Sequence, residues 1–222
     1  MSTPAPDTQS AMPQTHHLSL PLNELQIHAL NVGDLVYLSG EIVISAGMPT
    51  YQRMLAWMDQ GKALPIELGG GALFHLGSYS RELDPATGAM EVVYMNPTTS
   101  TRFSDFMPRL IRGHGLRLVG GKGGLDERSV EAMREVGCAY LSFLGGGCTL
   151  LSEAIREVVA VEWRDLIFHY RLVKLRVENL GPATVGMDAK GNSLYGRLNE
   201  DAAARLPAIM AQLAARRAAS MC

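Results

Sequence analysis

Two short polar motifs, each between a strand-like and a helix-like stretch, constrain the fold of this chain more than any other feature. The first motif, residues 97–102, contains a proline, several hydroxyl residues and an arginine. The second, residues 120–124, places one lysine among glycines. Apolar residues precede each motif, and apolar residues at helical spacing follow it. A layered α/β domain supplies such strand-to-helix junctions, so this fold class is favoured over a helix bundle.

The residue types in these motifs are suited to binding an anion. The first backbone N–H groups of a helix have no partner inside the helix, and the helix dipole favours negative charge there. Hydroxyls, a guanidinium and an ammonium beside such N–H groups would hold a carboxylate or a phosphate. The alternative is that the glycines form tight turns and the hydroxyls cap helices, but capping does not account for the arginine and the lysine. The candidate site residues are Thr98, Thr99, Ser100, Arg102, Gly121, Lys122 and Gly123.

The remaining segments predict a mixed order of strands and helices. The expected strands are residues 35–38, 42–44, 72–76, 90–95, 116–119, 138–144 and 172–177. Helical spacing of apolar residues predicts helices over 51–58, 103–111, 130–136 and 150–158. Residues 183–187 and 193–195 flank a polar, glycine-containing stretch, which predicts a hairpin with its turn at 188–192.

The two ends of the chain differ from its middle. Residues 1–17 are rich in Pro, Ser, Thr, Gln and Ala, which predicts a disordered leader before a domain over residues 18–198. Residues 199–222 read as a C-terminal helix, because Asn199 can cap it and Arg216 and Arg217 suit its last turn. Pro207 interrupts this pattern, so the helix either bends there or begins near it.

Composition excludes several classes of protein. The 222 residues carry a formal net charge of −2 and no basic stripe, which argues against a nucleic-acid binder. No apolar run reaches membrane-spanning length, and the N-terminus lacks a signal pattern. The cysteines are Cys138, Cys148 and Cys222, with no Cys-x-x-Cys pair. We therefore expect no metal site in this chain and, because free thiols suit a reducing compartment, a cytoplasmic location.

Several motifs carry a family resemblance. Residues 33–40 resemble the start of the C-terminal domain of class I (iron–sulfur) fumarate hydratases, a domain shared with the β subunit of L(+)-tartrate dehydratase. Residues 97–102 are similar to the substrate loop of that family, and residues 121–124 to its glycine–lysine loop. Further blocks match in the same order, so that the resemblance spans about residues 18–198; they are residues 138–141, 163–166 and 185–192.

The resemblance implies a swivelling β/β/α domain, a layered sheet with flanking helices, and a hydro-lyase that acts with a partner. In two-subunit members an α subunit carries a [4Fe–4S] cluster, so no cofactor is expected on this chain alone. The implied reaction is reversible loss of water from a 2-hydroxy (di)carboxylic acid of the fumarate, malate or tartrate type, in a hetero-oligomer. By resemblance, Thr98 would be the base or proton relay, and Arg102 and Lys122 would bind carboxylate.

Three loops depart from the family pattern. Residues 46–50 lack the arginine and histidine of the usual Arg-Asp-Ala-Ala-His, residues 167–171 replace Gly-Met-Pro-Glu-Ala, and Gly77-Ser78 replaces Gly-Pro. Either Arg53, Arg81 or Arg171 replaces the missing guanidinium, or the substrate lacks one carboxylate. The same departures favour an alternative function, that of a non-catalytic anion-binding or regulatory subunit that keeps the fold.

Overall fold

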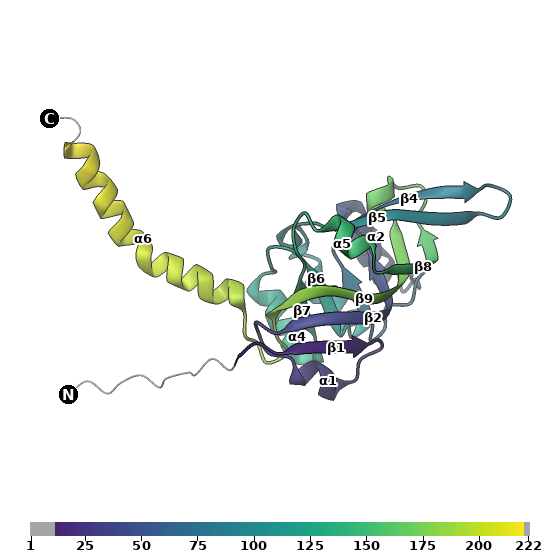
Figure 1. Cartoon of the computed structure of the whole chain (residues 1–222), viewed down its shortest axis with the longest axis horizontal. Coiled ribbons are helices and arrows are strands. Elements are labelled where there is room, and N and C mark those ends of the chain that lie inside the picture. Colours follow the sequence, from purple (N-terminus) through teal and green to yellow (C-terminus); the bar gives the residue numbers. More distant parts are fainter. Residues whose placement is uncertain (1–11, 220–222) are drawn as a thin grey trace.

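Strands and helices alternate along residues 12–219, the part of the chain that the computed structural model describes (Figure 1). The strands are β1 (Thr15–Ser19), β2 (Leu35–Ile44), β3 (Ala72–Phe74), β4 (Leu76–Asp84), β5 (Ala89–Pro97), β6 (Leu118–Gly121), β7 (Ala139–Ser142), β8 (Ile155–Glu162) and β9 (Leu172–Met187). The helices are α1 (Glu24–Ala29), α2 (Met48–Asp59), α3 (Met107–His114), α4 (Glu127–Val136), α5 (Cys148–Ser152) and α6 (Leu194–Ala219), with 3-10 turns η1 (Ser100–Phe103) and η2 (Phe168–Tyr170). The expected mixed α/β class is confirmed.

The main sheet has seven strands in the order β1-β2-β3-β6-β7-β9-β8. β2, β3, β6 and β7 run parallel to one another, as strands connected through helices do. β9 pairs antiparallel with β7, with β8 and also with β2, so β2, β3, β6, β7 and β9 form a closed ring of strand pairings. β4 and β5 form a separate two-stranded sheet that projects from the body (Figure 1).

Alternating side chains of the central strands supply two buried cores. On β3, Ala72 and Phe74 join the first core, whereas Leu73 between them joins the second. The second core continues under the three larger helices of the body through residues such as Tyr51 on α2, Met107 on α3 and Met133 on α4. Helices thus cover one face of the central parallel strands.

Local sequence signals set the limits of the helices that follow the two motifs. Asp126 caps α4, because its carboxylate accepts hydrogen bonds from the backbone N and the hydroxyl of Ser129 at 3.0 and 2.7 Å. Gly115 after α3 and Gly137 after α4 adopt left-handed backbone angles, with φ of 55° and 70°, which glycine adopts readily. These two helices therefore begin and end close to where the sequence predicts.

The prediction of a helix over residues 150–158 is wrong. The structure has the short helix α5 followed by the edge strand β8. β8 contains Val158, Val159 and Val161, and β-branched residues favour strands. Its backbone pairs antiparallel with β9, a partner that local apolar spacing does not reveal.

The expected leader is too long, because its last three residues lie in β1. This strand pairs in parallel with β2, with Thr15 opposite Leu35. Asp34 holds the segment: its carboxylate lies 2.9 Å from His16 Nε2 and accepts a hydrogen bond from the backbone N of Gln14 at 2.9 Å. Burial alone would raise the pKa of Asp34, but these hydrogen bonds and that from Asn31 lower it overall. Residues 1–11 of the expected leader lie outside the described residues.

The C-terminal helix begins earlier than expected and replaces the second strand of the predicted hairpin. Among the residues that the structure describes, a single bridge, Met187 to Ser193, spans the turn, and α6 begins at Leu194. The Ser193 hydroxyl accepts a hydrogen bond from the backbone N of Gly196 at 3.2 Å, which caps the first turn. Figure 1 shows α6 projecting away from the domain with a bend along its length, and Pro207 lies inside the helix.

Candidate functional site

The two polar motifs meet through their backbones. Thr99 and Lys122 form a parallel bridge. The backbone N of Ser100 donates to the carbonyl of Lys122 at 2.8 Å, and the backbone N of Lys122 donates to the carbonyl of Thr98 at 3.1 Å. The backbone N of Thr98 in turn donates to the carbonyl of His75 at 2.9 Å, directly after β3. The structure therefore places Thr98, Thr99 and Lys122 side by side at the ends of β5 and β6.

Glycines in the second motif permit this close approach. A Cβ on Gly121 would collide with Ser100 Oγ and lie 3.0 Å from both the Thr98 carbonyl oxygen and His75 Cβ. Gly123 and Gly124 adopt positive φ angles of 80° and 78°, a conformation that side chains disfavour. Gly121 and Gly123 thus shape the loop that presents Lys122.

A buried hydrogen-bonded chain lies beneath the two motifs. Ser100 Oγ is 2.8 Å from His75 Nδ1 and 2.8 Å from the Tyr140 hydroxyl. The Tyr140 hydroxyl also accepts a hydrogen bond from the backbone N of Gly124 at 3.2 Å. Ser100 is fully buried, so its side chain lies in the interior. The sequence had led us to expect this side chain to contact a ligand instead. Its position joins strands β3 and β7 to both motifs.

Burial sets the protonation states in this chain of side chains. It lowers the pKa of His75 to about 3, so the imidazole is neutral at physiological pH. It also raises the pKa of the Tyr140 hydroxyl, which stays protonated. The His75 ring stacks on Phe103 at 4.6 Å between ring centres, and its Nε2 lies 3.3 Å from Met107 Sδ. This role of His75 and of Tyr140 was not predicted from the sequence. For His75 the available signal was a polar ring inside the apolar run 72–76.

The cations of the two motifs have no acidic partner. Within residues 12–219, neither the Arg102 guanidinium nor the Lys122 ammonium forms a hydrogen bond or an ion pair. Several other arginines have acidic partners; Arg112, for example, donates from Nε and Nη2 to both carboxylate oxygens of Glu135. Arg102 is exposed and Lys122 is partly buried. Both charges are therefore available to an external anion.

The three segments that depart from the family pattern lie against one another beside the first motif, and they are not all loops: residues 48–50 begin α2, residues 77–78 lie in β4, and residues 168–170 form η2. The backbone N of Ala46 donates to the carbonyl of His169 at 3.0 Å. A Cβ on Gly77 would lie 3.1 Å from Ala46 Cβ and 3.5 Å from His169 Cβ. Gly77 pairs with Asn96, two residues before Thr98. The departures thus form one continuous surface next to the candidate site.

Each arginine that we considered as a replacement for the missing guanidinium is already engaged. Arg53 forms a two-pronged ion pair with Asp165, at 2.9 and 2.6 Å. Arg81 Nε lies 2.7 Å from Glu91 Oε2. Arg171 donates from Nη1 to the carbonyl and the hydroxyl of Ser80, at 3.2 and 3.1 Å. Asp165 and Glu91 thus neutralise Arg53 and Arg81, whereas Arg171 keeps its charge and is held by hydrogen bonds to neutral groups of Leu166 and Ser80.

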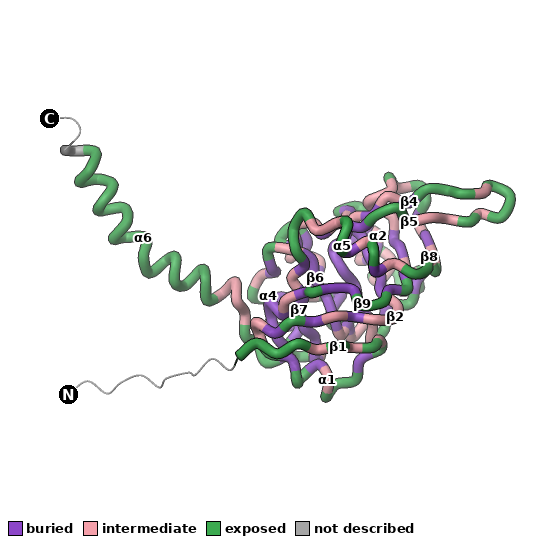
Figure 2. Tube along the Cα trace, in the orientation of Figure 1, coloured by how far each residue is buried: buried purple, intermediate pink, exposed green. Residues whose placement is uncertain are grey.

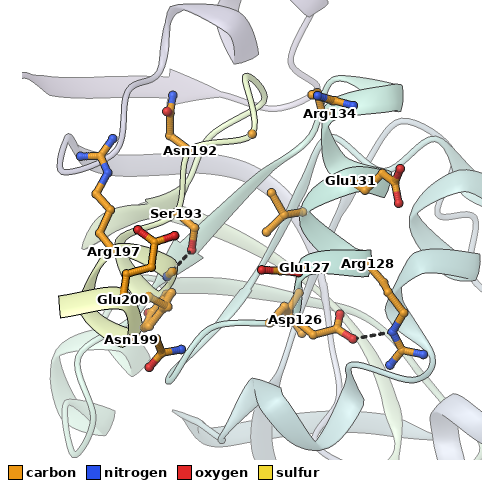
Figure 3. A pocket seen from close by; sticks show the side chains of 15 residues that line it. Asp126, Glu127, Arg128, Glu131, Arg134, Asn192, Ser193, Arg197, Asn199 and Glu200 are labelled. Carbon is orange, nitrogen blue, oxygen red and sulfur yellow. Dashed lines mark hydrogen bonds and ion pairs between the residues drawn. The ribbon is translucent and has the colours of Figure 1, made fainter. Parts of the chain in front are cut away.

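Two cavities lie outside the motifs. The larger, of about 1030 Å³, opens between α4 and the first turns of α6 and is lined by charged side chains of both signs, including Arg128, Arg134, Arg197 and Glu200 (Figure 3). The smaller, of about 330 Å³, has a largely apolar lining that includes Leu35, Leu144 and Leu150. Its lining also includes Gly145, where a Cβ would lie 3.6 Å from Lys122 Cδ, so this hollow lies close to the candidate site.

Metal-binding side chains do not cluster in the described part of the chain. Among residues 12–219, no group of three or more His, Cys, Asp or Glu side chains could hold a metal ion. Cys138 is buried, and burial raises the pKa of its thiol, while Cys148 is partly exposed. Cys222 lies outside the described residues. No helix of the described residues has the length and apolar character needed to cross a membrane.

Comparison with known proteins extends the family resemblance to nearly the whole domain. The family described as Fumarase C-terminus matches residues 2–198. The L(+)-tartrate dehydratase subunit beta of Escherichia coli K12 is 29% identical over 177 residues, which cover 80% of this chain and 85% of that protein. A Methanocaldococcus jannaschii protein with the same subunit name is 28% identical over 180 residues, 81% of this chain and 90% of that protein. A Geobacillus stearothermophilus protein named as a class I fumarate hydratase is 31% identical over 189 residues, which cover 85% of this chain and only 35% of that longer protein.

Proposed function

This chain belongs to the fumarase C-terminus family, and we propose that it is the β subunit of a two-subunit hydro-lyase. The reaction is the reversible loss of water from a 2-hydroxy carboxylic acid. Relatives that match over most of their length carry the name tartrate dehydratase subunit beta, which supports this assignment. The domain takes the swivelling β/β/α arrangement of that family.

The partner in this proposal is an α subunit that carries a [4Fe–4S] cluster. The described residues of this chain do not fit such a cluster, because they bring no set of cysteines together. The β subunit instead contributes side chains to a site shared between the subunits of a cytoplasmic hetero-oligomer. The open, cationic surface formed by the two motifs supports this division of roles.

The observation that supports the proposal is the bridge between the motifs, which places the backbone of Lys122 beside Thr99, three residues before Arg102; neither cation has an acidic partner among residues 12–219. Arg102 offers a planar fork that matches a carboxylate through two hydrogen bonds. Lys122 offers a compact charge beside the glycine amides of its loop. Together they hold and orient the carboxylate next to the carbon that loses its proton.

Thr98 is the proton-transfer residue in this proposal. Its backbone N and carbonyl are both fixed, by His75 and by Lys122, so its side chain starts from a rigid position. A hydroxyl is a poor base by itself, so Thr98 Oγ1 passes the proton of the substrate carbon onward to an acceptor in the assembled site. Thr99 and the amides of Gly121 and Gly123 complete the substrate-binding loops.

The substrate differs from fumarate and malate at one end. The surface formed by Ala46, Gly77 and His169 lies beside the first motif and includes the segment in which the family pattern would place an arginine. Asp165 and Glu91 neutralise Arg53 and Arg81, and hydrogen bonds hold the Arg171 guanidinium on Leu166 and Ser80, so none of the three takes the place of that guanidinium. A second carboxylate here would be desolvated without a charged partner, which costs on the order of a few kcal/mol. We therefore assign a 2-hydroxy acid that presents an uncharged group at this end.

Co-expression with an α-type subunit from the same genome, followed by anaerobic purification and a hydration screen over unsaturated acids, tests the proposal. On the substrate found, Arg102→Lys removes the fork and Lys122→Met removes the charge. Each change should lower kcat/KM at least about tenfold, or about 1.4 kcal/mol. Arg109→Lys, on an exposed arginine paired with Asp59, is the control and should leave kcat/KM unchanged. Full activity in both motif variants would contradict the site assignment.

Thr98→Val tests the proton-transfer role separately from binding. It removes the hydroxyl and keeps the shape of the side chain, so kcat should fall by at least about tenfold with little change in KM. Thr101→Val, at an exposed position of the same motif, is the matched control. A rise in KM with an unchanged kcat would assign Thr98 to binding alone.

Ala46→Arg tests the substrate assignment. Ala46 is partly exposed on the altered surface, so an arginine there can reach solvent and a bound ligand. The variant should gain activity toward malate or fumarate if the missing guanidinium set the substrate preference. If Ala46→Gln gains the same activity toward malate or fumarate, the size or polarity of the new side chain is the cause and its charge is not.

A non-catalytic anion-binding subunit is the second candidate, favoured by the three altered loops. In that case no α-type subunit would yield hydration activity, yet the isolated chain would bind small carboxylates and lose this binding in Arg102→Lys. Titration calorimetry with the carboxylates of the screen distinguishes the two functions.

A further inference from the structure

One face of the hairpin formed by β4 and β5 belongs to the altered surface beside the first motif. Burial along this hairpin rises from its exposed tip toward the body of the domain (Figure 2). At the body end alternate residues are buried, namely Leu76, Ser78, Met95 and Pro97. Gly77 and Asn96 lie between them, are partly exposed, and stand directly opposite each other in the antiparallel pair. Opposite residues of such a pair share a face, so the Asn96 side chain leaves the hairpin on the side of Gly77.

That side is the one on which the family pattern has changed. A Cβ on Gly77 would lie 3.1 Å from Ala46 Cβ and 3.5 Å from His169 Cβ. Asn96 therefore faces the same surface as these two side chains. Only Pro97 separates Asn96 from Thr98, and two extended residues span about 7 Å. One small acid is thus long enough to contact both Thr98 and Asn96.

The carboxamide of Asn96 has no hydrogen-bond partner in the described part of the chain. Its Oδ1 is buried and accepts no hydrogen bond, and its Nδ2 donates none to residues 12–219. A covered oxygen without a donor is unfavourable, so such an atom calls for a partner from outside the fold. Because no hydrogen bond holds the group, rotation about its Cβ–Cγ bond is free to turn both polar atoms toward a ligand.

Aromatic rings continue this face away from the first motif. The rings of Tyr79 and Tyr94, which are opposite each other in the hairpin, stack at 6.1 Å between centres. Phe168 meets Tyr79 edge-on at 4.9 Å and His169 at 4.0 Å. A carboxylate without a cation is poorly solvated beside such rings, whereas an uncharged polar group loses much less. The surroundings of Asn96 therefore favour an uncharged group that forms hydrogen bonds.

We propose that Asn96 is a specificity-determining residue and that the substrate is the monoamide of a 2-hydroxy dicarboxylic acid. This rests on the proposed function, in which Thr98, Arg102 and Lys122 act on the carboxylate end. Asn96 Oδ1 accepts a hydrogen bond from the substrate amide, and Asn96 Nδ2 donates one to its carbonyl oxygen. A carboxylate has no hydrogen to give to Oδ1, and a methyl ester has none either. A planar carboxamide satisfies both atoms.

The first test measures binding to the isolated full-length chain, so that it requires no activity. The probes are the monoamide of succinic acid, succinate and monomethyl succinate, which share one carboxylate and differ only at the other end. Magnetic resonance of the Asn side-chain amides should show the Asn96 signals moving with the monoamide. Its Kd should be at least about fivefold lower than that of either other probe.

Variants of Asn96 separate recognition from a structural role. Asn96→Leu should abolish the preference for the monoamide without lowering the melting temperature, because it removes a buried oxygen that has no partner. Asn96→Asp, a second variant of nearly the same shape, offers only acceptors and should also lose the preference. Asn199→Leu, on the exposed part of α6, is the matched control and should keep it.

The second test uses the complex with an α-type subunit. Hydration of the monoamide of fumaric acid should exceed that of fumarate and of monomethyl fumarate at least about tenfold in kcat/KM. Asn96→Leu should lower kcat/KM for the monoamide and leave that for the methyl ester unchanged. A monoamide that is hydrated no better than fumarate would overturn the inference.

The binding results distinguish this inference from the proposed function. Equal affinity for the three probes, weakened in each case by Arg102→Lys, overturns the role of Asn96 and supports the carboxylate site. A monoamide preference that depends on Asn96 but not on Arg102 supports the role of Asn96 and contradicts that site. Failure of the isolated chain and of the complex to bind the monoamide overturns the inference.

Discussion

At the scale of single residues, the Tyr140 hydroxyl connects the two motifs, because it bonds to Ser100 Oγ and accepts from the Gly124 backbone N. Tyr140→Phe leaves that buried N–H without a partner, so the free energy of unfolding should fall by about 1–3 kcal/mol. Urea denaturation measures the loss. Tyr195→Phe, which removes a partly buried hydroxyl bonded to Ser142, is the control and should cost less. Equal losses would show that the buried hydrogen bonds of Tyr140 stabilise the fold no more than the partly buried hydrogen bond of Tyr195.

The neutral imidazole of His75 makes stability depend on pH. Its ring lies among Tyr51, Ser100, Phe103 and Met107, none of which is charged at neutral pH. Burial lowers its pKa from 6.5 to about 3, so between these values the unfolded chain binds a proton that the folded chain does not. Above pH 6.5 His75 therefore costs the folded state no stability. Below pH 6.5 the free energy of unfolding falls as the pH decreases, and His75 contributes at most about 1.4 kcal/mol per pH unit to this fall.

His75→Gln removes the titration and keeps a polar side chain, so its unfolding free energy should fall less steeply than that of the wild type between pH 6.5 and 4.5. Denaturation at a series of pH values gives both slopes. Parallel slopes would mean that His75 does not stay neutral in the fold. The carboxylates that also titrate at low pH are common to both proteins and cancel in the difference.

The charged residues of the two motifs were singled out from the sequence, but the buried contacts beneath them were not predicted. Arg102 and Lys122 stood out because their charge has no role in a turn or a cap. Ser100 was expected to contact a ligand because it lies in a hydroxyl-rich run. Its contacts with His75 and Tyr140 join residues 25 and 40 positions apart, and they depend on the register of β3, β6 and β7. No local pattern encodes that register.

At the scale of elements, the turn between β9 and α6 depends on one buried carboxylate. Asp188 Oδ1 accepts from the backbone N of Lys190 and of Asn192, each at 3.0 Å, and Oδ2 accepts from Asn192 Nδ2 at 2.9 Å. Asp188→Ala leaves these donors without a partner, so unfolding free energy should fall by about 2–3 kcal/mol. Asp84→Ala, in the projecting β4–β5 turn, should cost clearly less, because water can replace the lost hydrogen bonds to Ala86 and Thr87. A thermal shift assay compares the two.

Elements governed by local chemistry were predictable, and those governed by distant partners were not. Helix α2, with Pro49 in its first turn, and the glycine-ended helices α3 and α4 follow from local end signals and apolar spacing. Residues 155–158 were predicted as the end of a helix because their apolar spacing fits one, yet they pair with β9 as the first half of β8. Ser193 starts α6 where the sequence suggested a second hairpin strand. In both cases tertiary pairing or a cap decided between two acceptable local patterns.

At the scale of the whole molecule, the absence of a cysteine cluster in residues 12–219 carries a prediction about iron. Anaerobic reconstitution of the isolated full-length chain with iron and sulfide should leave no stoichiometric iron after desalting. The co-expressed complex, treated in the same way, should retain it and show the visible absorption of a cluster. Iron bound in equal amounts to the isolated chain would place the cluster on this subunit.

The ring of strand pairings bears on how the protein is made. β9 is the last strand, yet it joins β2 near the start of the chain to β7 and β8. Such long-range pairing slows folding, since distant segments must meet before their contacts stabilise anything. During translation the edges of β2 and β7 stay open until β9 leaves the ribosome, and open apolar edges invite aggregation. A nascent chain interrupted before Leu172 therefore exposes these strand edges to chaperones and proteases. The main sheet can be completed only after the ribosome has made residue 187.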